Sequence, residues 1–156
     1  MTAEEFLSRI ETYDTLIDGK LNERQKLWCL ATRMTASFDR EAVQKSGLSD
    51  KVGEIGTKLA YIEREIDEVI DTYIDIQNEC IEVIEMLAGK PLYYKVIHMH
   101  FVDYVSYADI AKSLHYSYTW IMEIKDRALA EVEKIINFDE KIQALEKSIK
   151  EKYVSS

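Results

Sequence analysis

The chain has 156 residues, of which 31% are charged, with one proline and five glycines. This length suffices for one domain or two small ones with a buried core, and the scarcity of helix-breaking residues favours an all-helical fold. The net charge of −9 argues weakly against a nucleic-acid partner. No apolar run approaches the roughly 18 residues of a membrane span, and the two cysteines have no redox spacing, so we expect a cytoplasmic protein.

The negative charge is concentrated in the first part of the chain. Residues 1–90 hold 11 Lys and Arg against 19 Asp and Glu, whereas residues 91–136 hold 5 against 6 and residues 137–156 hold 4 against 4. We therefore divide the chain into three parts: an acidic part over 1–90, a nearly neutral part over 91–136 and a C-terminal part over 137–156.

The stretch 52–87 predicts one long helix. Its apolar residues recur at alternating steps of three and four, which is the spacing of a coiled-coil seam. They are Val52, Ile55, Leu59, Ile62, Ile66, Val69, Tyr73, Ile76, Cys80, Val83 and Leu87. We expect Ser49 or Asp50 to cap the start of this helix, and Gly89 with Pro91 to end it.

A similar series from about residue 3 to residue 35 predicts a partner helix. Its members are Phe6, Ile10, Tyr13, Ile17, Leu27, Ala31 and Met34, and polar residues interrupt it near Gly19, Lys20 and Arg24. Together the two stretches predict a long antiparallel helical hairpin, a coiled coil, over residues 1–90; two core helices of an ordinary bundle are the alternative. Further isoleucines widen the apolar surface and favour a homodimer or docking of the second half: Ile70, Ile74, Ile81 and Ile84.

Residues 91–136 have the pattern of a helix-turn-helix domain. Pro91 marks a helix start, Ser106 with Asp109 three residues later caps the next helix, and Ser117 caps the one after it. His115 occupies the corner between the last two helices, where positive φ is tolerated, and Tyr116 is expected to fill that corner. The expected core residues are Ile110, Ala111, Leu114, Ile121, Ile124, Ala128, Leu129 and Val132.

The segment "VIHMHFVDYVSYADIAKSLHYSYTWIMEIKDRALAEVEKI" resembles region 4 of sigma-70-type factors, in which an Ala-Leu pair also follows a Ser-capped helix start. Together with the upstream "VQKSGLSDKVGE", the chain resembles a family of small proteins from phages and integrated elements of Gram-positive bacteria. That family joins a helical hairpin to a region-4-like domain and is related to ArpU- and RinA-type late transcription regulators. The resemblance covers residues 5–136, and its marks are Val43-Gln44, Ser46, Asp50 and Tyr116-Ser117-Tyr118.

The resemblance implies transcriptional regulation of mobile-element genes in a bacterial host cell, through exposed side chains that meet the major groove of duplex DNA. The implied DNA-binding residues are Tyr118, Thr119, Trp120, Glu123 and Arg127, with Lys112 and Lys125 adding phosphate contacts. Only three of these are basic, and affinity for duplex DNA depends largely on phosphate neutralisation. A single copy should therefore bind weakly, and a homodimer would double the contacts.

Two other functions compete with DNA binding. In a protein-interaction module, the acidic hairpin would engage RNA polymerase or another regulator, and exposed Trp120 and Met122 would serve as a docking surface. A purely structural coiled-coil dimer is the third possibility. No Gly-rich phosphate loop, nucleophile constellation or zinc spacing occurs, and His98 and His100 point to different helix faces. We therefore expect no enzyme, no catalytic or cofactor-binding residue and no metal site.

The C-terminal part predicts a separate amphipathic helix. Asn137 with Glu140 is expected to cap it. Its apolar face is expected to dock on the hairpin or on a second subunit, and consists of Phe138, Ile142, Leu145 and Ile149.

Overall fold

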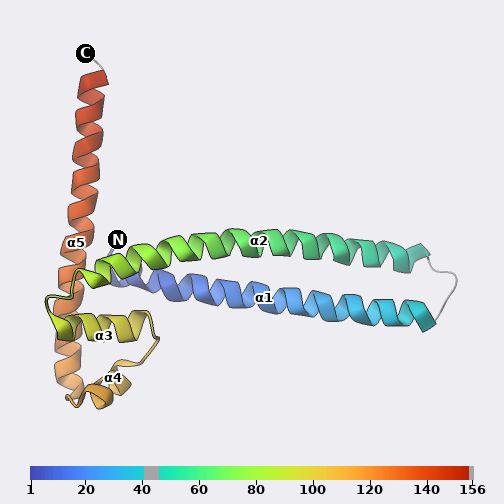
Figure 1. Cartoon of the computed structure of the whole chain (residues 1–156), viewed down its shortest axis with the longest axis horizontal. Helices are drawn as coiled ribbons and strands as arrows, with labels where there is room; N and C mark the ends of the chain where they lie inside the picture. The colour runs from blue at the N-terminus through green and yellow to red at the C-terminus, as the bar shows by residue number, and fades with distance from the viewer. Residues whose placement is uncertain (41–45, 155–156) are drawn as a thin grey trace. The chain divides into compact units, whose positions relative to one another are not determined.

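The computed structural model describes the backbone of residues 1–40 and 46–154, and the side chains of residues 1–34 and 50–154. Its elements are five helices: α1 (Ala3–Arg40), α2 (Ser46–Glu85), α3 (Pro91–Phe101), α4 (Tyr107–Leu114) and α5 (Tyr118–Val154) (Figure 1). Within these described ranges there is no strand, so the predicted all-α class is confirmed. None of the helices in the described part of the chain combines the length and apolarity needed to cross a membrane.

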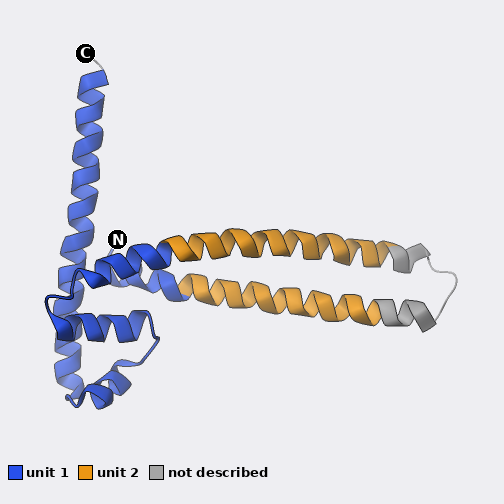
Figure 2. Cartoon of the chain, viewed as in Figure 1, with its two compact units in different colours: residues 1–11, 76–156 blue, residues 12–75 orange. Residues whose placement is uncertain are grey.

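The chain divides into two compact units (Figure 2). The first unit joins residues 1–11 to residues 76–156, and so contains the start of α1, the end of α2, and α3 to α5. The second unit is residues 12–75, the remainder of α1 and α2. The boundaries that we placed after residues 90 and 136 follow charge and sequence pattern rather than these contacts, and they stay predictions.

In the second unit, α1 and α2 run side by side in opposite directions (Figure 1). The seam residues Ile55, Ile62 and Ile66 of α2 are buried, because the three-and-four spacing keeps them on one face. α2 already begins at Ser46, before the start expected from the seam. The predicted cap at Ser49 or Asp50 is therefore wrong, and the motif residues 43–44 lie outside the described residues.

The polar interruption of the α1 series has a structural role in the second unit. Lys20 Nζ lies 2.6 Å from Glu65 Oε2, so an ion pair joins α1 to α2 at the position where polar residues interrupt the apolar series. The hydrogen bond from Lys20 lowers the pKa of Glu65, and the same bond raises the pKa of Lys20. A hydrogen bond to Glu65 also raises the pKa of Tyr61 on the previous turn of α2.

In the first unit, α3, α4 and the first half of α5 form a small three-helix group, which we call the head. Its core contains Val96, Ile110, Ala111, Ile121 and Ile124. Partly buried residues surround this core: Leu92, Tyr93, Met99, Val105, Tyr107 and Leu114. Of the predicted core residues, all are buried except Leu114 and Leu129, which are half-buried. The helical spacing thus identified the apolar face of each helix in the head.

The C-terminal part is not a separate helix. α5 runs without a break from Tyr118 to Val154, so the helix start predicted at Asn137 is wrong. No glycine or proline interrupts this range, and an asparagine inside a helix costs less than about 1 kcal/mol relative to alanine. The capping residues seen in the sequence are therefore accommodated within one continuous helix of 37 residues.

Candidate nucleic-acid interface

Local backbone chemistry sets the corner before α5. The backbone N–H of Asp109 donates to Ser106 Oγ and that of Trp120 donates to Ser117 Oγ, each at 3.2 Å, so both predicted serine caps are confirmed. His115 has the left-handed conformation (φ 60°, ψ 37°) that ends α4 and reverses the chain. The capped helix starts and the left-handed residue together fix where α5 begins.

Tyr116 does not fill the corner as predicted. Its side chain is exposed, with 47% of the residue's surface accessible. The residue contributes instead through its backbone, whose N–H donates to the carbonyl of Ala111 at 3.0 Å and so satisfies the end of α4. On α4, Ile110 and Ala111 are buried in the core of the head, as the sequence predicted.

Three of the predicted site residues form one connected group on the first three turns of α5. Arg127 Nη2 lies 2.6 Å from Glu123 Oε1, and both side chains are about half exposed. The Arg127 guanidinium carbon lies 5.6 Å from the centre of the Trp120 ring, within the range of a cation–π contact. Residues at i, i+3 and i+7 share a helix face. Trp120, Glu123 and Arg127 therefore present one surface, which we call the α5 face.

Two further site residues adjoin this face at the start of the helix. Tyr118 is the first residue of α5, with 54% of its surface accessible, and Thr119 is exposed beside it. Met122, which we expected to be exposed, is half-buried. The start of α5 thus offers an aromatic ring, a hydroxyl and an indole to solvent.

The two predicted phosphate contacts differ in their surroundings. Lys112 is exposed on the last turn of α4. Lys125 is not: its side chain is only 19% exposed, its ammonium lies 5.5 Å from the centre of the Tyr107 ring, and it pairs with Asp126 at 3.1 Å. Because residues two apart point to different helix faces, Lys125 does not join Arg127 on the α5 face.

The tyrosine at the start of α4 is partly buried against the core of the head. The Tyr107 ring stacks on the His100 ring at 3.8 Å, and burial raises the pKa of the Tyr107 hydroxyl. His100 Nδ1 is 2.9 Å from the carbonyl oxygen of Val105, and His98 Nδ1 is 3.1 Å from Asp103 Oδ2. Both histidines thus hold the connection between α3 and α4.

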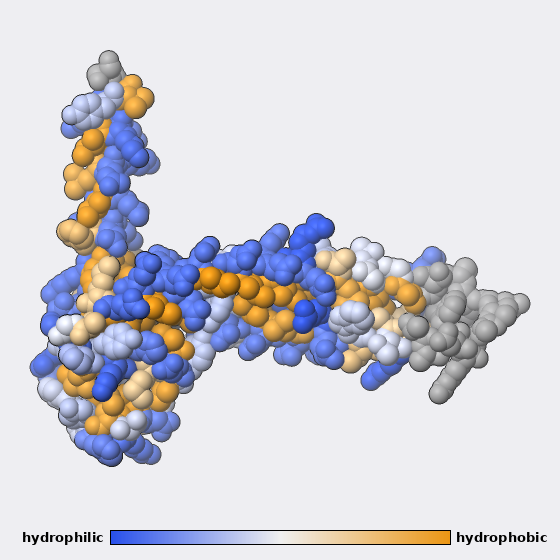
Figure 3. Space-filling model, viewed as in Figure 1, coloured by the Kyte–Doolittle hydropathy of each residue, from blue (hydrophilic) through white to orange (hydrophobic). Residues whose placement is uncertain are grey.

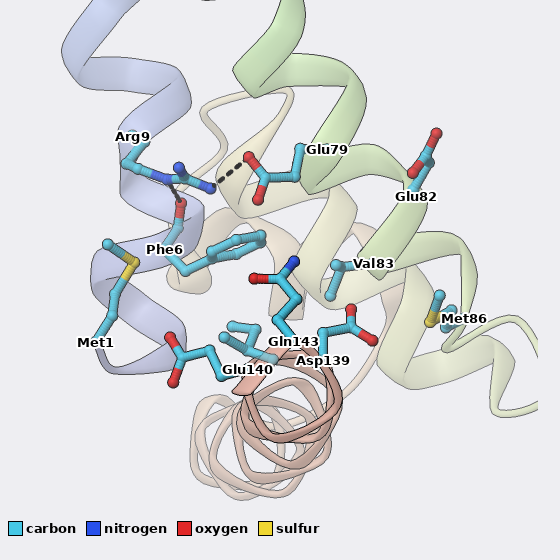
Figure 4. Close-up of a pocket in the computed structure, with 11 residues that line it drawn as sticks. Met1, Phe6, Arg9, Glu79, Glu82, Val83, Met86, Asp139, Glu140 and Gln143 are labelled. Carbon is cyan, nitrogen blue, oxygen red and sulfur yellow. Dashed lines mark hydrogen bonds and ion pairs between the residues drawn. The ribbon is translucent and has the colours of Figure 1, made fainter. Parts of the chain in front are cut away.

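The first unit also contains a small cavity of about 300 Å³ (Figure 4). Figure 4 shows Phe6 and Arg9 of α1 opposite Glu79 of α2, with Asp139 and Gln143 of α5 along another side. Arg9 is already engaged, since it pairs with Glu79 at 3.2 Å and donates to the Phe6 carbonyl at 3.0 Å. The cavity therefore offers acceptor groups but little free positive charge.

The buried thiol near this cavity is poorly suited to nucleophilic chemistry. Cys80 is fully buried and lies 3.5 Å from the Phe6 carbonyl oxygen. Burial raises its pKa to about 11, although the Arg9 guanidinium opposes that rise. At neutral pH the group is a thiol, not the thiolate that attacks electrophiles. Cys29, the other cysteine, is exposed on α1.

The described side chains were also compared with the requirements of a metal site. Over the described ranges, no group of three or more His, Cys, Asp or Glu residues is arranged to hold a metal ion. Comparison of the chain with protein-family models, curated proteins and solved structures finds no match. The geometry of the head is therefore the main structural argument about function.

Our sequence analysis predicted none of these contacts, although one of them has a local signal in the sequence. The spacing of Glu123 and Arg127 is the i,i+4 spacing of a helix ion pair, so their contact was readable in advance. The half-burial of Lys125 was not, because it depends on Tyr107, which only the packing of α4 on α5 brings close. The Arg9–Glu79 pair, 70 residues apart in the sequence, gave no local signal.

Proposed function

We propose that the protein is a transcriptional regulator of phage or mobile-element origin that binds duplex DNA through a helix-turn-helix resembling region 4 of sigma-70-type factors. In this proposal α4 and the start of α5 are the two helices of the motif, and α5 enters the major groove. The hairpin of α1 and α2 serves as a coiled coil that dimerises or holds a partner such as RNA polymerase. The protein acts in the cytoplasm of the bacterial host.

The single observation that carries the proposal is the α5 face itself. Trp120, Glu123 and Arg127 are exposed and held on one side of a helix whose opposite side, at Ile121 and Ile124, is buried in the head. A recognition helix needs this division, because it must present side chains to base edges while its other face is fixed. The capped start of α5 adds Tyr118 and Thr119, which suit phosphate contacts and thymine methyl groups.

The electrostatics of the α5 face set the expected strength of binding. Arg127 is paired with Glu123, so a guanine or phosphate contact must compete with an existing ion pair. Lys112 remains exposed on α4, whereas Lys125 is packed against Tyr107. Each phosphate that a protein neutralises steepens the salt dependence of binding. A head with so few available cations should bind weakly alone and needs a second copy for useful affinity.

The test is a selection of bound fragments from a random pool of duplex DNA, followed by gel retardation at low salt. The proposal predicts enrichment of one sequence motif and loss of retardation in Arg127→Glu. Lys58→Glu is the matched control, because Lys58 also belongs to an exposed i,i+4 ion pair, with Glu54, but lies in the second unit. No enrichment, or equal loss in both variants, contradicts sequence-specific reading by the α5 face.

A second function is favoured by the same ion pair. The charges of Glu123 and Arg127 neutralise each other, and Trp120 provides apolar surface, which suits a protein partner. In that function the helix-turn-helix is a docking surface that does not touch DNA, and RNA polymerase or another regulator is the partner. Two binding experiments separate the two functions. If the protein is not retained on DNA-cellulose at any salt concentration, and RNA polymerase binds to the immobilised protein, the docking function is favoured.

A further inference from the structure

The second half of α5 carries an apolar stripe that the first unit leaves open. Its side chains are spaced four, three and four residues apart, and between 39% and 62% of each residue is exposed: Phe138, Ile142, Leu145 and Ile149. Figure 3 shows apolar surface running along this part of α5 between hydrophilic residues. Four large apolar side chains in one line on a solvated helix indicate a missing partner.

The stripe is distinct from the face by which α5 packs in its own unit. Ile136 is buried and is one of the residues that line the cavity of the first unit. Glu140 and Gln143 of α5 line the same cavity (Figure 4). At 3.6 residues per turn, that face points more than about 100° away from the line through Ile142 and Leu145. Tighter packing of α5 around this cavity would therefore leave the stripe exposed.

The identity of the stripe residues selects a two-stranded coiled coil. In heptad notation, isoleucine occupies the a positions and phenylalanine and leucine occupy the d positions. β-branched residues at a with leucine at d favour parallel dimers over trimers and tetramers. The a positions are Ile135, Ile142 and Ile149, and the d positions are Phe138 and Leu145.

The charges beside the stripe suit a second copy of the chain in parallel orientation. Lys134 and Lys141 occupy successive g positions, directly before the a-position residues Ile135 and Ile142. Asp139 and Glu146 occupy the e positions, each directly after a d residue. In a parallel pair in register, each g side chain faces the e side chain five residues later on the partner. Lys134 then meets Asp139, and Lys141 meets Glu146. An antiparallel pair would bring lysine to lysine and acid to acid.

These four charged groups are available for such pairing. All are exposed, and Lys134 Nζ makes a long contact with Glu131 Oε1, at 3.9 Å. Burial of the four stripe side chains in two copies would remove on the order of 800 Å² of apolar surface from water. The aliphatic parts of the flanking lysine side chains add to this area. The total approaches the roughly 1,000 Å² that a specific interface is expected to exceed.

We propose that residues 135–152 of α5 form a parallel, in-register two-stranded coiled coil with the same residues of a second copy. The dimer axis then runs along α5, and the two heads lie at the same end of the coil. This geometry has a consequence that rests on the proposed function: two α5 faces related by a two-fold axis read two half-sites, so the selected DNA should be an inverted repeat.

The test measures the mass of the full chain in solution over a range of concentrations, by sedimentation or light scattering. The expected wild-type mass is that of two chains. Leu145→Glu places a carboxylate in the stripe and should raise the concentration at half-dimerisation at least about 100-fold. Ala144→Glu is the matched control: it adds the same charge at the neighbouring exposed position, outside the stripe, and should leave the mass unchanged. Circular dichroism of both variants checks that the helices remain folded.

Direction is tested by cross-linking. In a Cys29→Ser background, Ile149→Cys should form a disulfide-linked dimer under mild oxidation, because a parallel pair places the two a-position thiols opposite each other. A monomeric wild type, a trimer, a dimer that Leu145→Glu leaves intact, or no cross-link at residue 149 overturns the inference. A dimer with this pattern that fails to bind DNA leaves the inference standing and contradicts the proposed function instead.

Discussion

Replacement of Ile121 by alanine tests whether the head is a packed core. Ile121 is fully buried among Val96, Ile110, Ala111 and Ile124. The substitution removes three buried carbon groups at about 0.8 kcal/mol each, and the cavity left behind brings the expected loss to about 3–4 kcal/mol. With a urea dependence of about 1–3 kcal/mol per molar, the unfolding midpoint of the head should fall by more than about 1 M.

The assay uses the position of the two tryptophans. Trp28 lies in the second unit and Trp120 in the first, so a Trp28→Phe background leaves tryptophan fluorescence that reports on the head alone. Ile74→Ala is the matched control, because it removes the same atoms from the second unit, at a site where 46% of the residue is exposed. Its midpoint should shift by less than a third as much. Equal shifts in the two variants would refute the packing described for α3, α4 and α5.

Three further predictions address the cap, the ion pair and the thiols. Ser117→Ala should destabilise the head by about 1 kcal/mol in the same urea assay, because the backbone N–H of Trp120 loses its acceptor. An unchanged unfolding midpoint would mean that the serine cap does not stabilise the head. Lys20→Met should raise the pKa of Glu65 toward its ordinary value in a carboxyl NMR titration. In the wild type, the stabilisation from this pair is present between the ordinary pKa values of Glu and Lys. It disappears as pH falls through the lowered pKa of Glu65 or rises through the raised pKa of Lys20, and an unshifted Glu65 would contradict the contact. At pH 8 a thiol reagent should label exposed Cys29 rapidly and Cys80 only on unfolding, and equal rates would contradict the burial of Cys80.

Features fixed by local chemistry were predictable from the sequence. Ser106 and Ser117 cap their helices because a hydroxyl at that position meets a free backbone N–H whatever the surrounding fold. The core positions Ile110, Ile121 and Ile124 followed from helical spacing, which requires only that one face be buried. All-helical structure followed from the same spacing and from the scarcity of glycine and proline.

Features fixed by tertiary contacts were not predictable. Tyr116 is 47% exposed, although its place in the corner suggested that its side chain would be buried. Lys125 lies beside Tyr107 of α4, and half-buried Lys20 of α1 pairs with Glu65 of α2. The continuity of α5 through Asn137 was missed because a capping residue is also tolerated inside a helix when both flanks are helical.

The most direct test of the central claim follows Trp120 while duplex DNA is added. With Trp28→Phe as background, titration with the selected duplex at low salt should change Trp120 emission saturably, and the apparent affinity should fall steeply as salt is raised. Arg127→Glu should abolish the change. Retardation of the same DNA with no change in Trp120 emission would show that binding occurs away from the α5 face, and absence of binding at every salt concentration would contradict the proposed function.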